Sequence, residues 1–528
     1  MMKILISDKL AEEGIKILRE EKEFEVDCKY DLKPEELKNA IKDYHGLIIR
    51  SATTVTADIL DNATNLKVIG RAGVGLDNVD LSAATKKGVV AMNTPAGNTT
   101  STAEHTMSMI LALSRNIPQA CASLKSGKWE RSKFNGVELR GKILGIIGFG
   151  RIGSTVGKFA KAFGMDIIVF DPFLSKEVAD KNGVKAVTLE DLLKTADYIT
   201  IHIPKSDETN NLIGDKEFSL MKKNARIINC ARGGIINEQA LIKALEEKKI
   251  AGCALDVYEE EPPPADSGLF KFDNCVVTPH LGASTSEAQI NVAIEIAETV
   301  RDALLGRGIV NAANFPSVDA QSYQFLEPYI NLAFRIGKFS GQLIKGAVNS
   351  IKIVYSGDLN NYKTAPVTLS IVNGILTPIL RDSINYINAA DIAKDRGIDV
   401  QEVKSNKAEE FVNCIKVDIQ TDQETFSIWG TLSGNHQPRI VKINHVYVEA
   451  KPEGYMLFIM NNDKPGLVGA IGNILGDGKV NIAGISLGRE AQDGVAISVV
   501  NVDSEVSKET IEKLRNTKDI LFVKLVQV

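Results

Sequence analysis

The chain has 528 residues, of which 44% are hydrophobic and 24% charged, and its 62 Lys and Arg against 67 Asp and Glu leave a formal charge of -5. A chain of this length predicts three or four domains at roughly 150 residues each, and the composition is not that of a disordered protein. It also lacks the basic surplus that binds nucleic-acid phosphates, so we expect no nucleic-acid partner.

Cysteine usage and hydropathy indicate the compartment. The six cysteines form no CxxC pair and no metal-ligand spacing, which is typical of reduced thiols in the cytoplasm. No uninterrupted apolar stretch reaches the roughly 18 residues that a membrane span needs, and the N-terminus becomes charged after one short apolar strand. We therefore expect a cytoplasmic protein without a bound metal or a membrane anchor.

Residues 3–95 alternate short β-branched runs with helical patterns. The runs are KILIS, FEVDC, GLIIRS, LKVIG and VVAMN. This rhythm predicts βαβ units around a parallel sheet, and we assign residues 1–97 to a first domain. The sequence Ser101-Thr102-Ala103-Glu104 matches a capping box, so it predicts the start of a long helix that leaves this domain.

Residues 142–279 form a second alternating block, whose candidate strands are KILGIIGFG, MDIIVFD, ADYITIHIP, ARIINCARG, IAGCALDVY and NCVVTPH. Six strands are expected for a doubly wound sheet, so we assign residues 98–283 to a second domain. The sequence from Ser284 to Glu287 matches another capping box and predicts an amphipathic helix that ends near Gly306. Its length and apolar stripe suit a return to the first domain, which residues 284–310 would complete.

The pattern changes after Phe315-Pro316. A helical stretch leads into SIKIVYSGDL, and later FSIWGTLSG and RIVKINHVYVEA alternate like antiparallel strands, so residues 317–450 are predicted to form an α+β domain. Residues 454–528 follow the order βαββαβ of a ferredoxin-like module. The chain is thus predicted to hold two parallel α/β domains followed by two smaller α+β domains.

A glycine-rich loop in the second block predicts a dinucleotide site. The sequence GFGRIG, residues 148–153, directly follows a strand and opens a helix, whose N-terminal amides can bind a pyrophosphate. Asp171 ends the next strand, where an acid accepts hydrogen bonds from the adenosine ribose and repels a 2'-phosphate. The pattern favours NAD over NADP. The alternative is a tight strand-to-helix turn with a solvated aspartate.

Three reactive side chains follow predicted strands of the same block, where open α/β sheets bind their ligands. His280 can take the hydroxyl proton as a hydride leaves the neighbouring carbon, and Glu261 can fix its tautomer. Arg232 can hold a substrate carboxylate and polarise the developing carbonyl. Taken singly, each has an ordinary alternative: a histidine in a capping turn, a solvated acidic loop at residues 259–261, and a surface ion pair.

Four segments in order, GFGRIG, NCARGG, LDVYEEEPP and TPHLGAST, resemble the D-isomer-specific 2-hydroxyacid dehydrogenases over roughly residues 1–310. The resemblance implies that Arg232, Glu261 and His280 are catalytic. It also implies that a flavodoxin-like substrate domain is hinged around Asn98 to a Rossmann NAD domain. The cofactor contacts that it implies are Gly148, Gly150, Arg151, Ile152, Gly153, Asp171, Cys230, Asp256, Gly282 and Ala283. Cys230 could instead be an inert buried thiol, and we favour backbone contact over thiol chemistry.

Two arginines indicate a phosphorylated substrate. Arg50 and Arg71 each end a strand of the first domain, so both are expected to face the second domain and to suit a dianionic phosphate. The sequence RAGVGLDNVD resembles the phosphoglycerate dehydrogenases of that family, which implies oxidation of 3-phosphoglycerate with NAD. The alternative is structural pairing with Asp77 or Asp80. Arg131 is a weaker candidate that would reach the site of a neighbouring subunit.

The C-terminal module resembles an ACT domain, a small-molecule sensor. With the intervening domain, the chain resembles the long form of the same dehydrogenases, in which paired ACT domains bind L-serine. The resemblance implies serine contacts from Asn461, Asp463 and Asn481 and a homo-oligomer, expected to be a tetramer. Asp463 and Asn461 depart from residues that are common in relatives, so a dimerisation module without a ligand is the alternative.

Two other functions fit parts of the sequence. A hydroxypyruvate, glyoxylate or D-lactate reductase would use the same His280 and Glu261, but it would not need Arg50 and Arg71 or a sensor module. A non-enzymatic NAD-sensing scaffold would bind NAD without turning over 3-phosphoglycerate. A substrate panel with NAD, repeated with L-serine, separates these functions.

Overall fold

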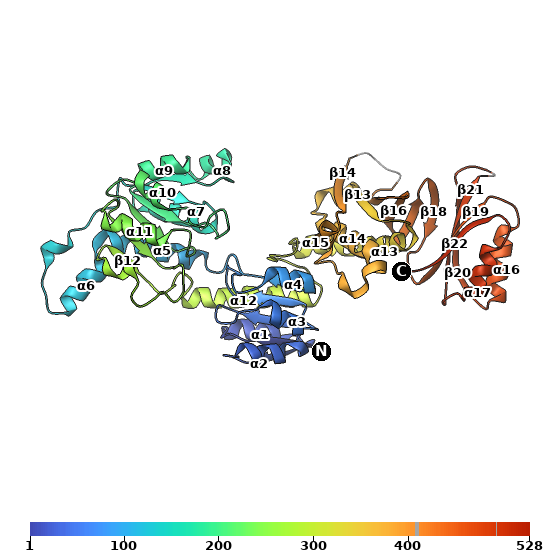
Figure 1. Ribbon diagram of the computed structural model, residues 1–528, viewed down its shortest axis with the longest axis horizontal. Coiled ribbons are helices and arrows are strands. Elements are labelled where there is room, and N and C mark those ends of the chain that lie inside the picture. The colour runs from blue at the N-terminus through green and yellow to red at the C-terminus, as the bar shows by residue number, and fades with distance from the viewer. Residues whose placement is uncertain (407–410, 493) are drawn as a thin grey trace.

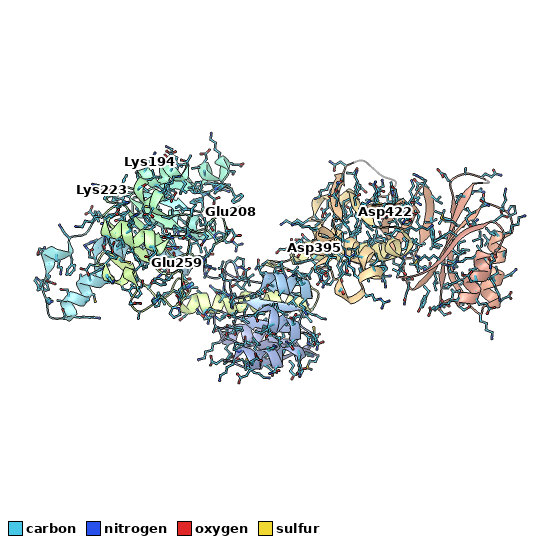
Figure 2. The ribbon with its side chains drawn as sticks, in the orientation of Figure 1. Lys194, Glu208, Lys223, Glu259, Asp395 and Asp422 are labelled. Atoms are coloured by element: carbon cyan, nitrogen blue, oxygen red, sulfur yellow. The ribbon has the colours of Figure 1, made fainter. Side chains whose placement is uncertain are left out.

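The computed structural model describes residues 1–406, 411–492 and 494–528. Four β-sheets lie along an elongated molecule: the seven-stranded sheet at one end, then the five-stranded, six-stranded and four-stranded sheets (Figure 1). Charged side chains of both signs cover its surface, as Lys194, Lys223, Glu208 and Glu259 show on the seven-stranded domain and Asp395 and Asp422 show on the six-stranded domain (Figure 2).

The N-terminal segment forms the five-stranded sheet, in the order β2-β1-β3-β4-β5 with every pair parallel. This order confirms the flavodoxin-like prediction. Its strands are β1 (Met2–Ile6), β2 (Phe24–Cys28), β3 (Gly46–Ile49), β4 (Val68–Arg71) and β5 (Val90–Met92). Its helices are α1 (Glu12–Glu20), α2 (Pro34–Ala40), α3 (Ala57–Asn62) and α4 (Leu81–Lys87). The central strands β3 and β4 are almost wholly buried, because helices cover both faces.

A helix from far along the chain covers one of these faces. Helix α12 (Ser286–Leu304) packs against α1 and β4. Gly14 lets the two helices cross closely, because a Cβ there would collide with the Ala293 carbonyl. The predicted N-cap at Ser284 is wrong by one residue: Thr285 caps the helix, and its Oγ1 accepts a hydrogen bond from the Ala288 amide at 3.1 Å.

The seven-stranded sheet is also parallel throughout, in the order β12-β11-β10-β9-β6-β7-β8. Its strands are β6 (Ile143–Ile147), β7 (Asp166–Phe170), β8 (Lys185–Ala186), β9 (Tyr198–Ile201), β10 (Arg226–Asn229), β11 (Gly252–Leu255) and β12 (Cys275–Val277). The strand β8 was not predicted, because two exposed residues carry no hydrophobic pattern. The helices are α5 (Thr99–Arg115), α6 (Ile117–Lys125), α7 (Arg151–Ala162), α8 (Lys176–Lys181), α9 (Leu189–Thr195), α10 (Asp215–Leu220) and α11 (Glu238–Glu246).

The predicted capping box at Ser101 is wrong. The N-cap residue of α5 is Asn98, three residues before Ser101, so the helix begins at Thr99 and has no side-chain cap. The Ser101 hydroxyl donates back to the Asn98 carbonyl at 3.1 Å, from inside the first turn. A capping pattern read from sequence cannot distinguish the cap from the first turn when several Ser and Thr residues stand together.

The intervening segment forms a mixed six-stranded sheet in the order β14-β13-β15-β16-β17-β18, in which only β13 and β14 run parallel. Its strands are β13 (Val348–Ser356), β14 (Asp399–Ser405), β15 (Cys414–Thr421), β16 (Thr425–Ser433), β17 (Gln437–Ile443) and β18 (Val446–Ala450). The helices are α13 (Ala320–Leu343), α14 (Ala365–Leu380) and α15 (Ala389–Asp395). Helices α13 and α14 approach closely at Gly341, where a Cβ would collide with the Ile375 carbonyl.

The C-terminal segment confirms the ferredoxin-like order βαββαβ. Its antiparallel sheet has the order β20-β21-β19-β22. The elements are β19 (Tyr455–Asn462), α16 (Leu467–Asp477), β20 (Ile482–Arg489), β21 (Val495–Val502), α17 (Lys508–Arg515) and β22 (Ile520–Gln527). The Glu449 amide in β18 donates to Ser486 Oγ on β20 at 2.8 Å, so this sheet packs directly on the intervening one. None of the described helices is long and apolar enough to cross a membrane.

Candidate active site

His280 and Glu261 face each other on neighbouring loops of the seven-stranded sheet. His280 Nδ1 lies 2.6 Å from Glu261 Oε2. Glu261 is held from within its own loop, because its Oε1 accepts a hydrogen bond from the Tyr258 amide at 3.2 Å. The Tyr258 hydroxyl donates to the Thr278 carbonyl at 2.9 Å and thereby ties the two loops together. The structure therefore brings the predicted histidine and glutamate into direct contact through Nδ1 of His280.

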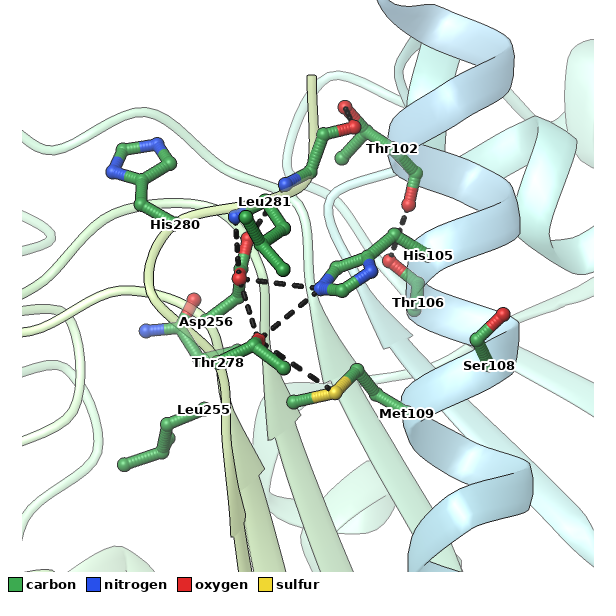
Figure 3. Close-up of polar contacts among 12 residues, drawn as sticks. Thr102, His105, Thr106, Ser108, Met109, Leu255, Asp256, Thr278, His280 and Leu281 are labelled. Carbon is green, nitrogen blue, oxygen red and sulfur yellow. Dashed lines mark hydrogen bonds and ion pairs between the residues drawn. The ribbon is translucent and has the colours of Figure 1, made fainter. Parts of the chain in front are cut away.

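The buried carboxylate of Asp256 organises the loop that carries His280 (Figure 3). Asp256 accepts hydrogen bonds from Thr278 Oγ1 at 2.6 Å and from the amides of Leu281 and Gly282 at 2.7 and 2.8 Å. Burial raises the pKa of Asp256, but these bonds and one from His105 outweigh it, so the pKa lies below its usual value. Asp256 therefore stays ionised and fixes residues 278–282 as a turn.

Arg232 reaches from the seven-stranded domain to the five-stranded one. Its backbone is fixed by buried Asn229, whose Nδ2 donates to the Arg232 carbonyl at 2.8 Å. Its Nε lies 3.3 Å from Asp77 Oδ2, in the loop after β4. Gly75 in that loop leaves room for the guanidinium, because a Cβ there would collide with Arg232 Nη2. The predicted substrate arginine thus lies where the two parallel domains meet.

Arg50 and Arg71 lie at the ends of the adjacent parallel strands β3 and β4, as predicted. Arg50 Nη1 donates to the Lys9 carbonyl at 3.1 Å, and Arg71 Nη1 donates to the Gly75 carbonyl. The Nε atoms of both arginines are buried and have no hydrogen-bond partner in the described part of the chain.

The charges around Arg71 show that the three arginines gather in one place. Burial, followed by the charge of Arg232, lowers the pKa of Arg71, and Arg50 lowers it further, whereas Asp77 raises it. The two acids that were considered as partners of Arg50 and Arg71 have other partners in the structure. Asp77 forms its ion pair with Arg232, and Asp80 caps α4 by accepting a hydrogen bond from the Ala83 amide at 2.9 Å. A concentration of guanidinium groups of this kind favours an anionic ligand.

The glycine loop has the geometry that a dinucleotide needs. Gly148 has a left-handed φ of 91°, and a Cβ there would lie 2.6 Å from the His202 carbonyl. A Cβ on Gly153 would collide with the Gly148 carbonyl, so α7 starts tightly against the loop. A Cβ on Gly150 would meet no described heavy atom within 4 Å. The loop is therefore open at Gly150, beside Arg151 and Ile152 at the start of α7, where a pyrophosphate can approach the amides.

Asp171 is pre-oriented beside this loop. Its Oδ2 accepts a hydrogen bond from the Phe149 amide and its Oδ1 accepts one from the Phe173 amide, both at 2.8 Å.

Cys230 is buried, and burial raises the pKa of its thiol to about 12, so the thiol is unreactive. The residues around the loop therefore fit NAD.

Four candidate residues lie away from this centre. Arg131 starts a short 3-10 turn after α6, and α6 lies on the side of the seven-stranded domain that faces away from the five-stranded sheet (Figure 1). Asn461 and Asp463 line one cavity at the start of α16. Asn481 lies before β20 and its Nδ2 donates to Asp503 Oδ2 at 2.6 Å. Within one chain, Asn481 is not among the residues that line that cavity.

Two residues that sequence reasoning missed support the site, together with Asp77, which it named as a partner for Arg50 or Arg71 and not for Arg232. His105 Nε2 lies 3.2 Å from Asp256 Oδ1. Asp8 accepts from the Arg50 amide at 2.6 Å and from Thr53, and so fixes the loop after β3. Asp77 pairs with Arg232. No local motif marks them, although Asp8 and Asp77 follow predicted strands in the same way as the residues that were identified.

Comparisons with known proteins agree with this geometry. Three family models match: "D-isomer specific 2-hydroxyacid dehydrogenase, NAD binding domain" over residues 107–282, "D-3-phosphoglycerate dehydrogenase intervening domain" over residues 325–444, and "ACT domain" over residues 455–519. The first of these covers the glycine loop and Asp171, so the cofactor is NAD.

Whole-length relatives cover the chain from end to end. The D-3-phosphoglycerate dehydrogenase of Methanocaldococcus jannaschii is 45% identical over 99% of this chain and 100% of its own length. That of Bacillus subtilis is 41% identical over 100% of both. A solved D-lactate dehydrogenase from Aquifex aeolicus, in complex with NAD and lactic acid, is 28% identical with a TM-score of 0.53 and covers 60% of this chain and 100% of its own. The chain therefore belongs to the D-3-phosphoglycerate dehydrogenase family.

Proposed function

We propose that this enzyme oxidises 3-phospho-D-glycerate to 3-phosphohydroxypyruvate and transfers the hydride to NAD, as the first step of L-serine biosynthesis. The observation that carries the proposal is the contact of His280 with Glu261 on loops of the seven-stranded sheet, and the guanidinium groups of Arg232, Arg71 and Arg50, which gather where the two parallel domains face each other, support it. A substrate with a carboxylate at one end, a phosphate at the other and a hydroxyl on the carbon next to the carboxylate matches this set of charges.

The roles follow from which atoms are already engaged. Glu261 holds Nδ1 of His280, so Nε2 accepts the proton of the C2 hydroxyl while C2 loses its hydride and becomes a carbonyl. The carboxylate of Glu261 stabilises the imidazolium that forms. Arg232 binds the substrate carboxylate, and Arg50 and Arg71 bind the phosphate. NAD, when bound, supplies the hydride acceptor.

The division of labour between domains follows from where these residues lie. Residues 1–97, completed by 284–310, form the substrate-binding domain, and residues 98–283 form the NAD-binding domain. Residues 317–450 are the intervening domain and residues 454–528 the ACT domain. The packing of α12 on α1 and β4 supports the return of the chain to the first domain. Closure around Asn98 would exclude water from the transferred hydride.

L-Serine is the effector that we propose for the ACT domain. Asn461 and Asp463 line a cavity of about 240 Å³. Asn461 is 2% exposed, and its Oδ1 has no hydrogen-bond partner among the described residues, so it suits an added donor such as an ammonium group. Asn481 completes the set only from a second ACT domain. A homo-oligomer, with a tetramer as its expected form, is therefore part of the proposal, and so is a cytoplasmic site of action.

The test is a substrate panel with the full chain. NAD reduction is expected with 3-phosphoglycerate at a much higher kcat/KM than with D-lactate, glycolate or D-glycerate. His280→Ala should lower kcat by roughly 10²-fold or more while NAD still binds, as isothermal titration calorimetry can show. Equal kcat/KM values for phosphorylated and unphosphorylated acids would contradict 3-phosphoglycerate as the substrate. An unchanged kcat in His280→Ala would show that His280 does not accept the substrate proton.

A further inference from the structure

The loop that carries His280 is held from two sides, and one side belongs to a distant helix. Thr102 and His105 lie three residues apart and thus on the same face of α5. Thr102 Oγ1 donates to the Gly282 carbonyl at 3.2 Å. His105 Nε2 lies 3.2 Å from Asp256 Oδ1 and 3.3 Å from Thr278 Oγ1. Figure 3 shows His105 and His280 on opposite sides of the loop, so His105 touches its anchor and not its reactive face.

The hydrogen-bond chemistry fixes the proton on His105. The Thr278 hydroxyl has a single proton, and Asp256 Oδ1, at 2.6 Å, is its nearest acceptor. Thr278 Oγ1 can then only accept from His105, and ionised Asp256 can only accept as well. Nε2 of His105 must therefore carry a proton, which it shares between the carboxylate and the hydroxyl. In this arrangement, an N–H from α5 completes the set of donors around the buried carboxylate.

The loop needs such support. His280 has a backbone φ of 55°, in the left-handed region that is strained for a non-glycine residue. A conformation of this kind persists only where surrounding bonds determine it. Asp256 supplies them through Leu281 and Gly282, and His105 fixes Asp256 in turn.

We propose that His105 is a positioning residue for the hydride-transfer reaction: by holding Asp256 and Thr278 it sets the loop in which His280 meets Glu261. The role rests on the proposed function, in which His280 accepts the substrate proton. The contacts of His105 are to Asp256 and Thr278, so it acts through the loop and not on the reacting atoms. Substitution of His105 therefore lowers the fraction of enzyme in which His280 is correctly aligned. We expect this to lower kcat while KM changes little.

The experiment compares two substitutions of His105 in the full chain. His105→Leu keeps the bulk and removes the N–H, whereas His105→Gln can place an amide N–H near the position of Nε2. In His105→Leu we expect kcat for 3-phosphoglycerate oxidation to fall about tenfold, while the KM values for 3-phosphoglycerate and for NAD stay within about twofold of wild type. In His105→Gln we expect kcat to recover to within about threefold of wild type. Ser108→Ala is the matched control on α5, because that hydroxyl donates to the Glu104 carbonyl of its own helix.

A second readout needs neither substrate nor cofactor. Hydrogen exchange of the Leu281 and Gly282 amides, followed by mass spectrometry, should be faster in His105→Leu and close to wild type in His105→Gln. In an Asp256→Asn background, His105→Leu should cause little further loss of kcat, because the two residues act through one contact.

The outcomes separate the two proposals. Wild-type enzyme that fails to reduce NAD with 3-phosphoglycerate overturns the proposed function and with it the positioning role. Active wild-type enzyme with an unchanged kcat in His105→Leu overturns the positioning role alone. The positioning role is likewise overturned if His105→Gln is as impaired as His105→Leu, or if the effects of His105→Leu and Asp256→Asn are additive.

Discussion

Arg232 and Asp77 form an ion pair between the two parallel domains, with Arg232 Nε 3.3 Å from Asp77 Oδ2. Arg232 follows β10 and Asp77 follows β4, so the pair links the arginine that we propose to bind the substrate carboxylate to an acid on the opposite domain. Asp77 is 64% exposed and the pair is correspondingly weak. A substrate carboxylate bound to Arg232 as proposed would therefore displace Asp77, which would compete with it for the guanidinium.

Removing this competitor should strengthen substrate binding. Asp77→Asn is expected to lower the KM for 3-phosphoglycerate by about threefold and to leave kcat nearly unchanged, with a smaller effect at high ionic strength. Steady-state kinetics at two salt concentrations measures this. Asp58→Asn is the control, because Asp58 pairs with Lys38 in the same domain. A higher KM in Asp77→Asn would mean that Asp77 orients Arg232 and does not compete for it.

Arg50 should discriminate by phosphate. Its Nε is buried without a partner among the described residues, and burial lowers its pKa, so an anionic ligand relieves an unfavourable environment. Arg50→Ala is expected to raise the KM for 3-phosphoglycerate by about 10- to 100-fold and to change the KM for D-glycerate by less than about threefold. Initial rates with both acids give the comparison. Equal effects of Arg50→Ala on the KM values of the two acids would contradict the proposal that Arg50 binds the phosphate.

Asp171 should set the preference for NAD. The amides of Phe149 and Phe173 hold its carboxylate in place, so its charge meets a 2'-phosphate without freedom to turn away. Asp171→Ala is expected to reduce the ratio of kcat/KM for NAD to that for NADP by at least about tenfold. Cofactor titrations at saturating 3-phosphoglycerate provide the measurement. If the ratio of kcat/KM for NAD to that for NADP is the same in Asp171→Ala as in wild type, the adenosine ribose does not bind at Asp171.

Asn461 should be required for inhibition by serine and not for catalysis. Its side chain lines the cavity at α16, far along the chain from the catalytic residues. Asn461→Ala is expected to raise the L-serine concentration for half-inhibition at least about tenfold and to leave kcat and KM without serine unchanged, as a coupling of about 1 to 3 kcal/mol implies. Inhibition curves with L-serine and D-serine test this. Inhibition that persists in the variant would exclude this cavity as the serine site.

His202 should make the protein sensitive to acid. Burial lowers its pKa to about 3, and Nδ1 is enclosed with no hydrogen-bond partner in the part of the chain described. Between pH 6.5 and 3 the unfolded chain therefore binds a proton that the folded one excludes, so the stability present above pH 6.5 is lost as the pH falls. His202→Gln should reduce the loss between about pH 7.5 and 5 by about 2 kcal/mol.

Urea unfolding at the two pH values, followed by circular dichroism, measures the effect of His202→Gln. His436→Gln, at an exposed histidine, is the control and should behave like wild type. Parallel loss of stability in His202→Gln and wild type would show that other groups cause the sensitivity to acid.

Some features of this protein could be read from short stretches of sequence. The glycine loop, the order of strands and the identities of Arg232, Glu261 and His280 are encoded within a few residues, because hydrophobic periodicity and loop chemistry act locally. The pairing of His280 with Glu261 was expected for the same reason, since both follow strands whose ends meet at one edge of a parallel sheet.

Other features depended on contacts between distant residues. The ion pair of Arg232 with Asp77, the support of Asp256 by His105 and the first residues of α5 and α12 could not be read from local patterns. Each depends on which surfaces the folded domains bring together, and a side chain gains or loses a partner only when that packing is complete. The sequence by itself therefore determined the chemistry that is available, and only the tertiary structure decided which charges oppose one another, because hydrogen bonds and ion pairs act over a few ångströms of space whatever their separation along the chain.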